Sequence, residues 1–134
     1  MKEIDMSNTQ TADQSKLPLL YCCSGAVGPA QLGNYVAQQI DRSHLAQWSN
    51  TMALSCGVPA HVQQAQSGRP VVAIDGCEQA CVKHILSEKG VTPVVWHQMT
   101  KSYPFAEHFN IDTDRARADE VVQEIAKTLP PKAA

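Results

Sequence analysis

The feature of the sequence that most restricts its fold is a short run of β-branched apolar residues that ends in an acid, a glycine and a cysteine. The run is VVAIDGC, residues 71–77, and it follows directly after Pro70. It shows no alternation of polar and apolar residues, which is typical of a strand buried on both faces. A strand of this kind needs a covering layer on each side, so the run favours an α/β protein with a parallel sheet.

Two further apolar runs are also followed directly by cysteine. LPLLY (residues 17–21) precedes a pair of cysteines, TMALS (residues 51–55) precedes another, and VTPVVW (residues 91–96) adds a fourth predicted strand. Apolar residues at helical spacing lie between and after these runs. They predict helices over residues 29–42, 59–66, 78–89 and 114–129. The alternation predicts a three-layer, Rossmann- or flavodoxin-like parallel sheet of about four strands with helices on both faces.

The chain is predicted to form a single domain over residues 17–134. Residues 1–16 are polar and aperiodic, which predicts a disordered N-terminal tail. The stretch from 97 to 112 shows no sustained period, and loops of that length in a compact domain are often functional. A lid over the cysteine-bearing edge is one interpretation of this stretch.

Charge and composition exclude several classes of function. The formal net charge is −2, and the basic residues are scattered, which argues against binding to nucleic acid or to an anionic membrane. No apolar run approaches the roughly 20 residues of a membrane span, and the N-terminus lacks the apolar core of a secretory signal. We therefore expect a cytoplasmic protein. In that reducing compartment, five cysteines favour metal binding, catalysis or simple burial over disulfides.

The cysteines are predicted to meet at one edge of the sheet. The carboxyl ends of parallel strands share an edge, and α/β folds bind their ligands there. Cys77 and Cys81 are four residues apart, a spacing that places two side chains on one face of a helix start. Cys23 and Cys56 follow the other two strands. Four thiols at this edge would suit tetrahedral zinc, with either Cys22 or His84 as a substitute ligand. Cys22 is nevertheless expected to pack in the core, because strand neighbours point to opposite faces.

Two polar residues beside the thiols have a structural and a functional interpretation. Asp75, at the end of a strand, can cap the following helix by accepting its amide hydrogens, or it can orient a bound group. Ser24 opens the stretch before the first helix, together with Gly25, and small residues with free amides can hold a small anion. Neither a P-loop nor a dinucleotide glycine pattern is present, so nucleotide binding is not indicated.

These residues together resemble a known family. The carrying segments are YCCSG (residues 21–25), AQL with NY (residues 30–35), SGRP (residues 67–70) and AIDGC with a second cysteine (residues 73–81). They resemble the DGC-domain family of bacterial proteins, which is named for its Asp-Gly-Cys motif. Four cysteines of the family are associated with zinc, and the resemblance carries that role onto four positions of this chain: Cys23, Cys56, Cys77 and Cys81.

Three functional hypotheses follow. The first is a small cytoplasmic metal-binding protein that holds zinc for a structural, storage or sensing purpose rather than for turnover. The second is a thiol-dependent enzyme or redox protein in which Cys23 or Cys77 is the nucleophile. The third is a module that binds a small anion or a partner protein and whose cysteines are merely buried. The sequence does not indicate a particular protein partner.

Overall fold

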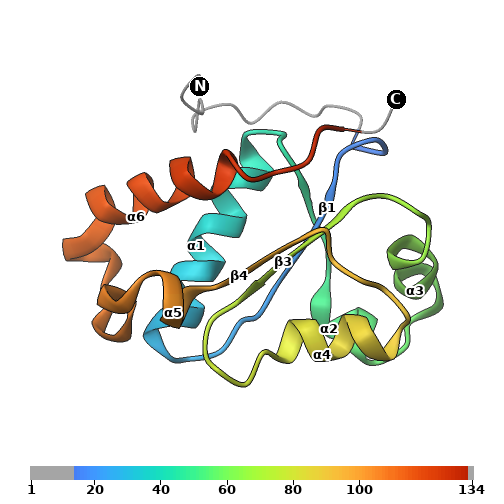
Figure 1. The fold of residues 1–134 in the computed structure, drawn as a ribbon, viewed down its shortest axis with the longest axis horizontal. Helices are drawn as coiled ribbons and strands as arrows, with labels where there is room; N and C mark the ends of the chain where they lie inside the picture. Colours follow the sequence, from blue (N-terminus) through green and yellow to red (C-terminus); the bar gives the residue numbers. More distant parts are fainter. Residues whose placement is uncertain (1–13, 133–134) are drawn as a thin grey trace.

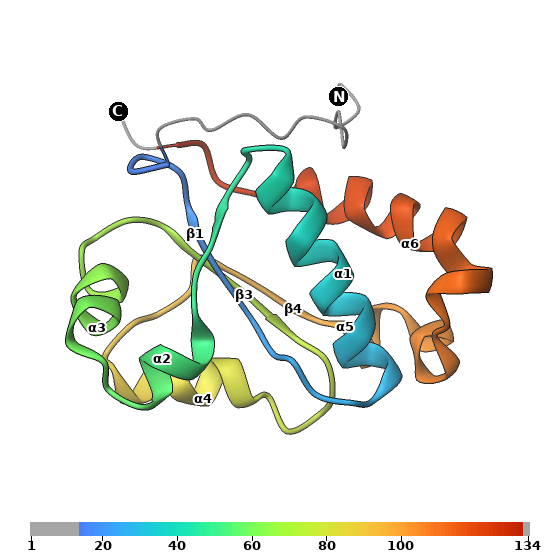
Figure 2. The same cartoon turned by 180° about the vertical axis from the view of Figure 1, so that it is seen from behind.

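The computed structural model describes residues 14–132 of the chain, and within them a four-stranded parallel sheet lies between two layers of helices (Figures 1 and 2). The order of the strands across the sheet is β2-β1-β3-β4. The strands are β1 (Leu19–Cys22), β2 (Gln47–Trp48), β3 (Val71–Asp75) and β4 (Val95–Gln98). The predicted fold class is confirmed. Residues 1–13 of the predicted tail lie outside the described residues.

Six α-helices and one 3-10 helix connect and follow these strands in the described part of the chain. They are α1 (Gly28–Arg42), α2 (Thr51–Ser55), α3 (Pro59–Ala65), α4 (Cys81–Glu88), α5 (Met99–Ser102), η1 (Pro104–His108) and α6 (Ile111–Ala126). Figures 1 and 2 show α1, α5 and α6 on one side of the strands and α2, α3 and α4 on the other.

The two sides of β1 belong to two separate apolar cores. Leu20 and Cys22 face the core formed with α1 and α6, whereas Leu19 and Tyr21 face the core formed with α3 and α4. All four side chains are at most 4% exposed. Full burial of a leucine side chain stabilises a fold by about 1.5–3 kcal/mol. Burial on both faces explains why the strands are continuous apolar runs in the sequence.

The order of the strands places a crevice between the carboxyl ends of β1 and β3. These two strands are hydrogen-bonded neighbours, with Cys22 paired to Ile74. The helix after β1, α1, covers one face of the sheet, and the helix after β3, α4, covers the other. After β1 the chain therefore crosses to one face of the sheet, and after β3 it crosses to the other. Open α/β sheets bind their ligands at such a reversal point.

Helix α1 forms over the residues that its sequence predicts. Pro29 lies in its first turn, where the missing N–H costs no intrahelical hydrogen bond. Leu32, Val36 and Ile40 recur at helical spacing and are fully buried against the sheet. The predicted helix over 59–66 is likewise confirmed as α3, within one residue at its end.

The prediction of a strand over residues 51–55 is wrong, because this segment is helix α2. The Asn50 side chain accepts a hydrogen bond from the Ala53 amide at 2.8 Å and caps the helix. Met, Ala and Leu then follow, all residues with high helix propensity. The strand itself lies earlier and is only two residues long, with Gln47 and Trp48 paired to β1. A pair of residues is too short to produce a periodic signal.

The stretch from 97 to 112 is mostly regular structure and does not cover the cysteine-bearing edge. Strand β4 extends to Gln98, and α5 and η1 follow it and pack against α1. Met99, Tyr103 and Ala106 are buried in the core on that side of the sheet. The prediction of a long loop is therefore wrong. These buried residues are spaced four and three apart, but α5 and η1 are too short to produce a sustained period in the sequence.

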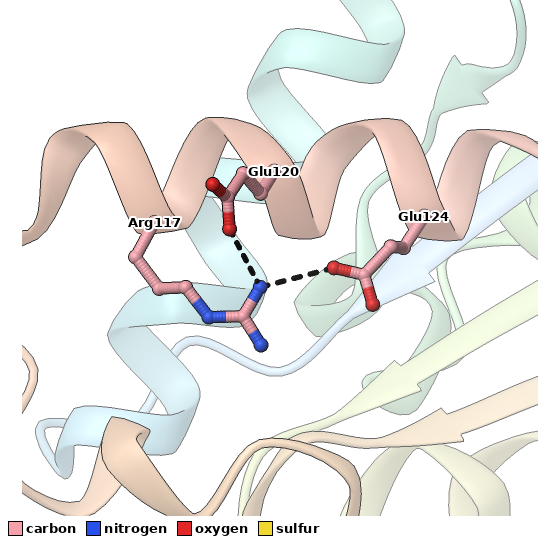
Figure 3. Close-up of polar contacts among 3 residues, drawn as sticks. All are labelled: Arg117, Glu120 and Glu124. Carbon is pink, nitrogen blue, oxygen red and sulfur yellow. Dashed lines mark hydrogen bonds and ion pairs between the residues drawn. The ribbon is translucent and has the colours of Figure 1, made fainter.

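Helix α6 holds this segment in place. Arg117 of α6 forms ion pairs of 3.1 Å with Glu120 and Glu124 on the same helix (Figure 3). Its guanidinium group also lies 5.8 Å from the ring centre of Tyr103 and 5.3 Å from that of Phe105. Cation–π contacts at such distances add to the apolar packing between α6 and the α5–η1 segment.

The N-terminal boundary of the fold is fixed by Arg69. Its guanidinium group donates hydrogen bonds to the carbonyl oxygens of Gln14 and Leu17 at 2.7–3.0 Å. Within the described residues, these contacts reach Gln14, three residues before the predicted boundary at residue 17. Within residues 14–132, none of the helices has both the length and the hydrophobicity that a membrane span requires.

Candidate functional site

A cavity of about 370 Å³ opens at the carboxyl ends of β1 and β3. It is lined by the end of β1 and the turn after it (residues 22–27), by one side of α2, by the turn after β3 (residues 75–77) and by the first turns of α4. Cys23, Cys77 and Cys81 all line it, as does Ser24, which is exposed. The fold therefore brings three of the four predicted thiols to one cavity.

Cys23 lies at the centre of this arrangement. The buried amide of Gly76 donates a hydrogen bond to Cys23 Sγ at 3.1 Å. The backbone of Cys23 is itself fixed, because its amide donates to the Ile74 carbonyl at 3.1 Å. The Cys22 thiol and the amides of Gly76 and Gly25 favour the thiolate and lower the pKa of Cys23 to about 6, although burial acts in the opposite direction. Cys23 is partly exposed and therefore accessible from the cavity.

Gly76 is the residue that makes this contact possible. A Cβ atom at this position would lie 2.5 Å from the Ala30 amide nitrogen of α1, which is far inside van der Waals contact. Only glycine allows the turn after β3 to lie this close to α1. The Gly76 carbonyl also accepts a hydrogen bond from the Thr100 amide at 2.9 Å. Gly76 is therefore held by hydrogen bonds at both its amide and its carbonyl.

Cys77 lies in a turn and not on a helix. The prediction placed Cys77 and Cys81 on one face of a helix starting near residue 78, but α4 begins only at Cys81. The residue before it, Ala80, has a left-handed backbone conformation with φ of 53°, and this turn delays the helix by three residues. The Cys77 carbonyl accepts a hydrogen bond from the buried Gln98 side chain at 3.1 Å, which ties the turn to β4.

Asp75 caps α4 from the end of β3. Its side chain is 1% exposed and accepts hydrogen bonds from the Val82 amide at 2.8 Å and the Lys83 amide at 3.2 Å. A third hydrogen bond comes from the Trp96 indole at 2.9 Å. Both carboxylate oxygens therefore have donors, and the negative charge sits at the positive end of the helix dipole. This arrangement leaves Asp75 fully engaged in the fold.

Of the remaining predicted ligands, Cys56 and His84 lie outside the cavity, and Cys22 lies in its buried wall. Cys56 is exposed at the C-terminal end of α2 and does not line the cavity, so the expectation that it follows a strand is wrong. Cys22 is 4% exposed and belongs to the core between the sheet and α1, as predicted. Its hydrogen bond with Cys23 and its burial raise the pKa of Cys22 well above the ordinary thiol value. His84 is exposed on α4 and does not line the cavity.

The described residues do not fit a metal ion as they are placed. Within residues 14–132, no group of three or more His, Cys, Asp or Glu side chains is arranged so that it could hold a metal. A closed zinc site needs four ligands with Zn–S distances near 2.3 Å. Of the four predicted cysteines, Cys56 lies outside the cavity, and the one carboxylate among the described lining residues, Asp75, is taken up by three donors.

Four residues in or beside the cavity have no clear signal in the sequence: Gly76, Val27, Met52 and Gln98. The Gly76 amide acts through its backbone, for which the Asp-Gly-Cys motif is the only hint. Val27 and Met52 form part of the cavity lining although they are 52% and 69% exposed, a degree of exposure that periodicity does not reveal. Gln98 does not line the cavity but holds Cys77 in place from the end of β4, a position that the prediction of a loop from residue 97 misses.

Comparisons with known proteins identify the family of the chain. The model of the DGC domain matches residues 19–125, from the first residue of β1 to the last turn of α6. The chain belongs to the DGC domain family. A relative in this family is the anaerobic and virulence modulator AnvM of Pseudomonas aeruginosa, which is 36% identical over 115 residues. The alignment covers 86% of this chain and 87% of AnvM. No solved structure matches the chain significantly.

Proposed function

We propose that this DGC-family protein carries out thiol–disulfide exchange, with Cys23 as the nucleophile and Cys77 as the second cysteine. The observation that carries the proposal is the hydrogen bond of 3.1 Å from the Gly76 amide to Cys23 Sγ at the wall of an open cavity. A thiolate is the reactive form of cysteine, and an amide donor aimed at the sulfur stabilises that form. Cys77 is the direct chain neighbour of the donor residue and lines the same cavity.

The exchange has two steps that balance in atoms and electrons. The Cys23 thiolate attacks one sulfur of a disulfide substrate, which breaks the substrate S–S bond, forms a mixed disulfide and releases one thiolate. The Cys77 thiol then loses its proton to solvent and attacks Cys23 Sγ, which releases the second thiolate and leaves a Cys23–Cys77 disulfide. Two electrons pass from the protein to the substrate. A dithiol reductant reverses the process and regenerates both protein thiols.

Cysteine variants treated with a small aromatic disulfide test the proposal. In the wild type, peptide mapping by mass spectrometry is expected to find a Cys23–Cys77 disulfide. Cys77→Ser is expected to accumulate the mixed disulfide on Cys23, and Cys23→Ser is expected to lose the rapid phase of the reaction. Cys56→Ser is the matched control, because this thiol is exposed and outside the cavity. A rapid phase that survives in Cys23→Ser, or a disulfide that links Cys23 to Cys81 instead, would contradict the assignment.

Zinc binding remains a separate prediction: three of the four predicted thiols line one cavity, although within residues 14–132 they are not arranged as a metal site. Thiolate ligands bind zinc strongly, and a cluster of thiols at one cavity is the chemistry that such binding needs. Metal analysis of protein purified under reducing conditions, repeated on Cys77→Ser, tests it. One equivalent of zinc that is lost in the variant would support metal binding. Clearly substoichiometric metal in the wild type would count against it.

A further inference from the structure

The charge of the cavity restricts what can approach Cys23. Among the described residues that line the cavity, none is Lys, Arg or His. The one carboxylate among them, Asp75, lies at the end of β3 and carries a buried negative charge beside the Cys23 thiolate. Like charges in a partly desolvated site repel further anions, and no cation in this lining offsets that repulsion.

Several backbone positions at the starts of the two nearby helices offer no free amide to a ligand. At α4, the amides of Val82 and Lys83 already donate to the Asp75 carboxylate. At α1, Pro29 has no N–H, and the Ala30 amide is covered by Gly76, whose missing Cβ would lie 2.5 Å from it. A helix N-terminus attracts anions only through free amides. At these positions the two helix starts therefore offer no free amide to a phosphate or carboxylate.

The nearest basic residue on α4 points to another contact. Lys83 Nζ lies 4.0 Å from the centre of the Trp96 ring, where a cation–π interaction holds it. Lys83 does not line the cavity. The ammonium group therefore does not supply the positive charge that the lining lacks.

Apolar side chains instead form much of the cavity wall. Val82 and Ile85 of α4 line the inner part, and Ala26, Val27 and Met52 lie nearer the surface. Val27 and Met52 are among the most exposed large apolar residues of the described chain, at 52% and 69%. A volume of about 370 Å³ is at the lower end of the range of about 300–1,000 Å³ that is usual for small-molecule pockets.

We propose that the cavity selects small, uncharged, apolar disulfides and excludes anionic ones such as those bearing carboxylates. This inference rests on the proposed thiol exchange at Cys23 and adds its substrate class. An apolar group gains from burial against Met52 and Ile85, whereas a carboxylate loses its hydration and meets only negative charge. Small thiol carriers with free carboxylates therefore react poorly, and neutral organic disulfides react well.

Two aromatic disulfides of similar size test this selectivity. Dithiobis(nitropyridine) is uncharged, and dithiobis(nitrobenzoic acid) carries two carboxylates; each releases a coloured thiolate on reaction. Stopped-flow rates at Cys23 are measured in Cys56→Ser protein, and the ratio of the neutral to the anionic rate is compared with the same ratio in urea-unfolded protein. The folded protein is expected to favour the neutral reagent by about tenfold or more relative to the unfolded chain.

A charge placed on the rim is expected to change this ratio. Met52→Lys adds a cation at an exposed position that lines the cavity, and two carboxylates at roughly 7–10 Å from it should react about three- to tenfold faster at low salt. The gain should shrink in 1 M salt, where the Debye length is about 3 Å. Val94→Lys is the matched control, because Val94 is also an exposed apolar residue, at 62%, but does not line this cavity. The ratio of the neutral to the anionic rate in Val94→Lys should equal the ratio in the parent protein.

The possible results separate the two proposals. A neutral preference that Met52→Lys reduces and Val94→Lys leaves unchanged supports the inference. Rapid reaction at Cys23 with no charge preference, or with a preference for the anionic reagent, overturns the inference while thiol exchange stands. Reaction at Cys23 that is no faster in folded than in unfolded protein, with either reagent, overturns the proposed function and the inference with it.

Discussion

Replacement of Asp75 by asparagine is expected to destabilise the fold strongly. The carboxylate is buried and accepts three hydrogen bonds, from the Val82 and Lys83 amides and the Trp96 indole. Asparagine has one acceptor oxygen, and its NH₂ group would face at least one of these donors. The loss of one hydrogen bond to a charged group costs about 1.5–3 kcal/mol, and an unpaired buried donor adds about 1–3 kcal/mol. We therefore expect a loss of about 3 kcal/mol, from a total of roughly 5–15 kcal/mol for a typical domain.

Urea unfolding followed by circular dichroism measures this loss. Asp75→Asn should shift the midpoint to lower urea without a change in slope, because the surface exposed on unfolding is the same. Glu78→Gln is the matched control, because Glu78 is an exposed acid in the same turn and its substitution should leave the midpoint unchanged. A loss below about 1 kcal/mol for Asp75→Asn would refute the idea that this carboxylate holds α4 against β3.

Three further predictions follow from the same region and from α6. Gly76→Ala should lower the unfolding free energy by about 1–3 kcal/mol and slow thiol exchange at Cys23, because the new Cβ would overlap α1. Gly25→Ala, whose Cβ would make an ordinary contact of 3.5 Å, should match the wild type in urea unfolding, and an equal unfolding free energy for the two variants would contradict the packing argument. The alkylation rate of Cys23 by iodoacetamide should be half-maximal near pH 6, and a half-maximal rate above pH 8 would contradict the lowered pKa of Cys23. Because the pKa of Cys23 is lower in the folded state, the stability that this thiolate adds at pH 9 should be lost as the pH falls towards 6. Cys23→Ser should not show this loss. Arg117→Ala should lower the unfolding free energy by less than about 1 kcal/mol, because the ion pairs of Arg117 are exposed. Part of that loss should vanish in 1 M salt. A large loss that does not depend on salt would mean that the contacts of Arg117 with the aromatic rings dominate.

The parts of the fold that the sequence predicts are those with long or strongly patterned signals. The buried run before Gly76 and the apolar stripe of α1 repeat over enough residues to fix both the type and the place of the element. The alternation of such elements was then sufficient to predict a parallel sheet covered on both faces. The convergence of Cys23, Cys77 and Cys81 follows from this topology, because β1 and β3 are neighbours.

The parts that could not be predicted depend on a few residues whose effects are tertiary. Strand β2 consists of two residues, so the apolar segment after it was taken for the strand, and Cys56 was misplaced with it. The left-handed conformation of Ala80 has no sequence signal, because alanine rarely adopts it, and it moves Cys77 off the helix. The cap of the following helix by Asp75, by contrast, was among the predictions, although it spans seven residues and does not match the local capping pattern.

The wall of the cavity formed by the five-residue helix α2 is packed less tightly than the wall formed by Gly76 and Ala30. Within the described chain, α2 contributes a single buried side chain, Leu54, and a hydrogen bond of 3.0 Å joins Thr51 to the Cys22 carbonyl. The opposite wall, where Gly76 lies directly on Ala30, has no room to retreat. We therefore expect a bulkier disulfide to displace α2 rather than the turn at Gly76.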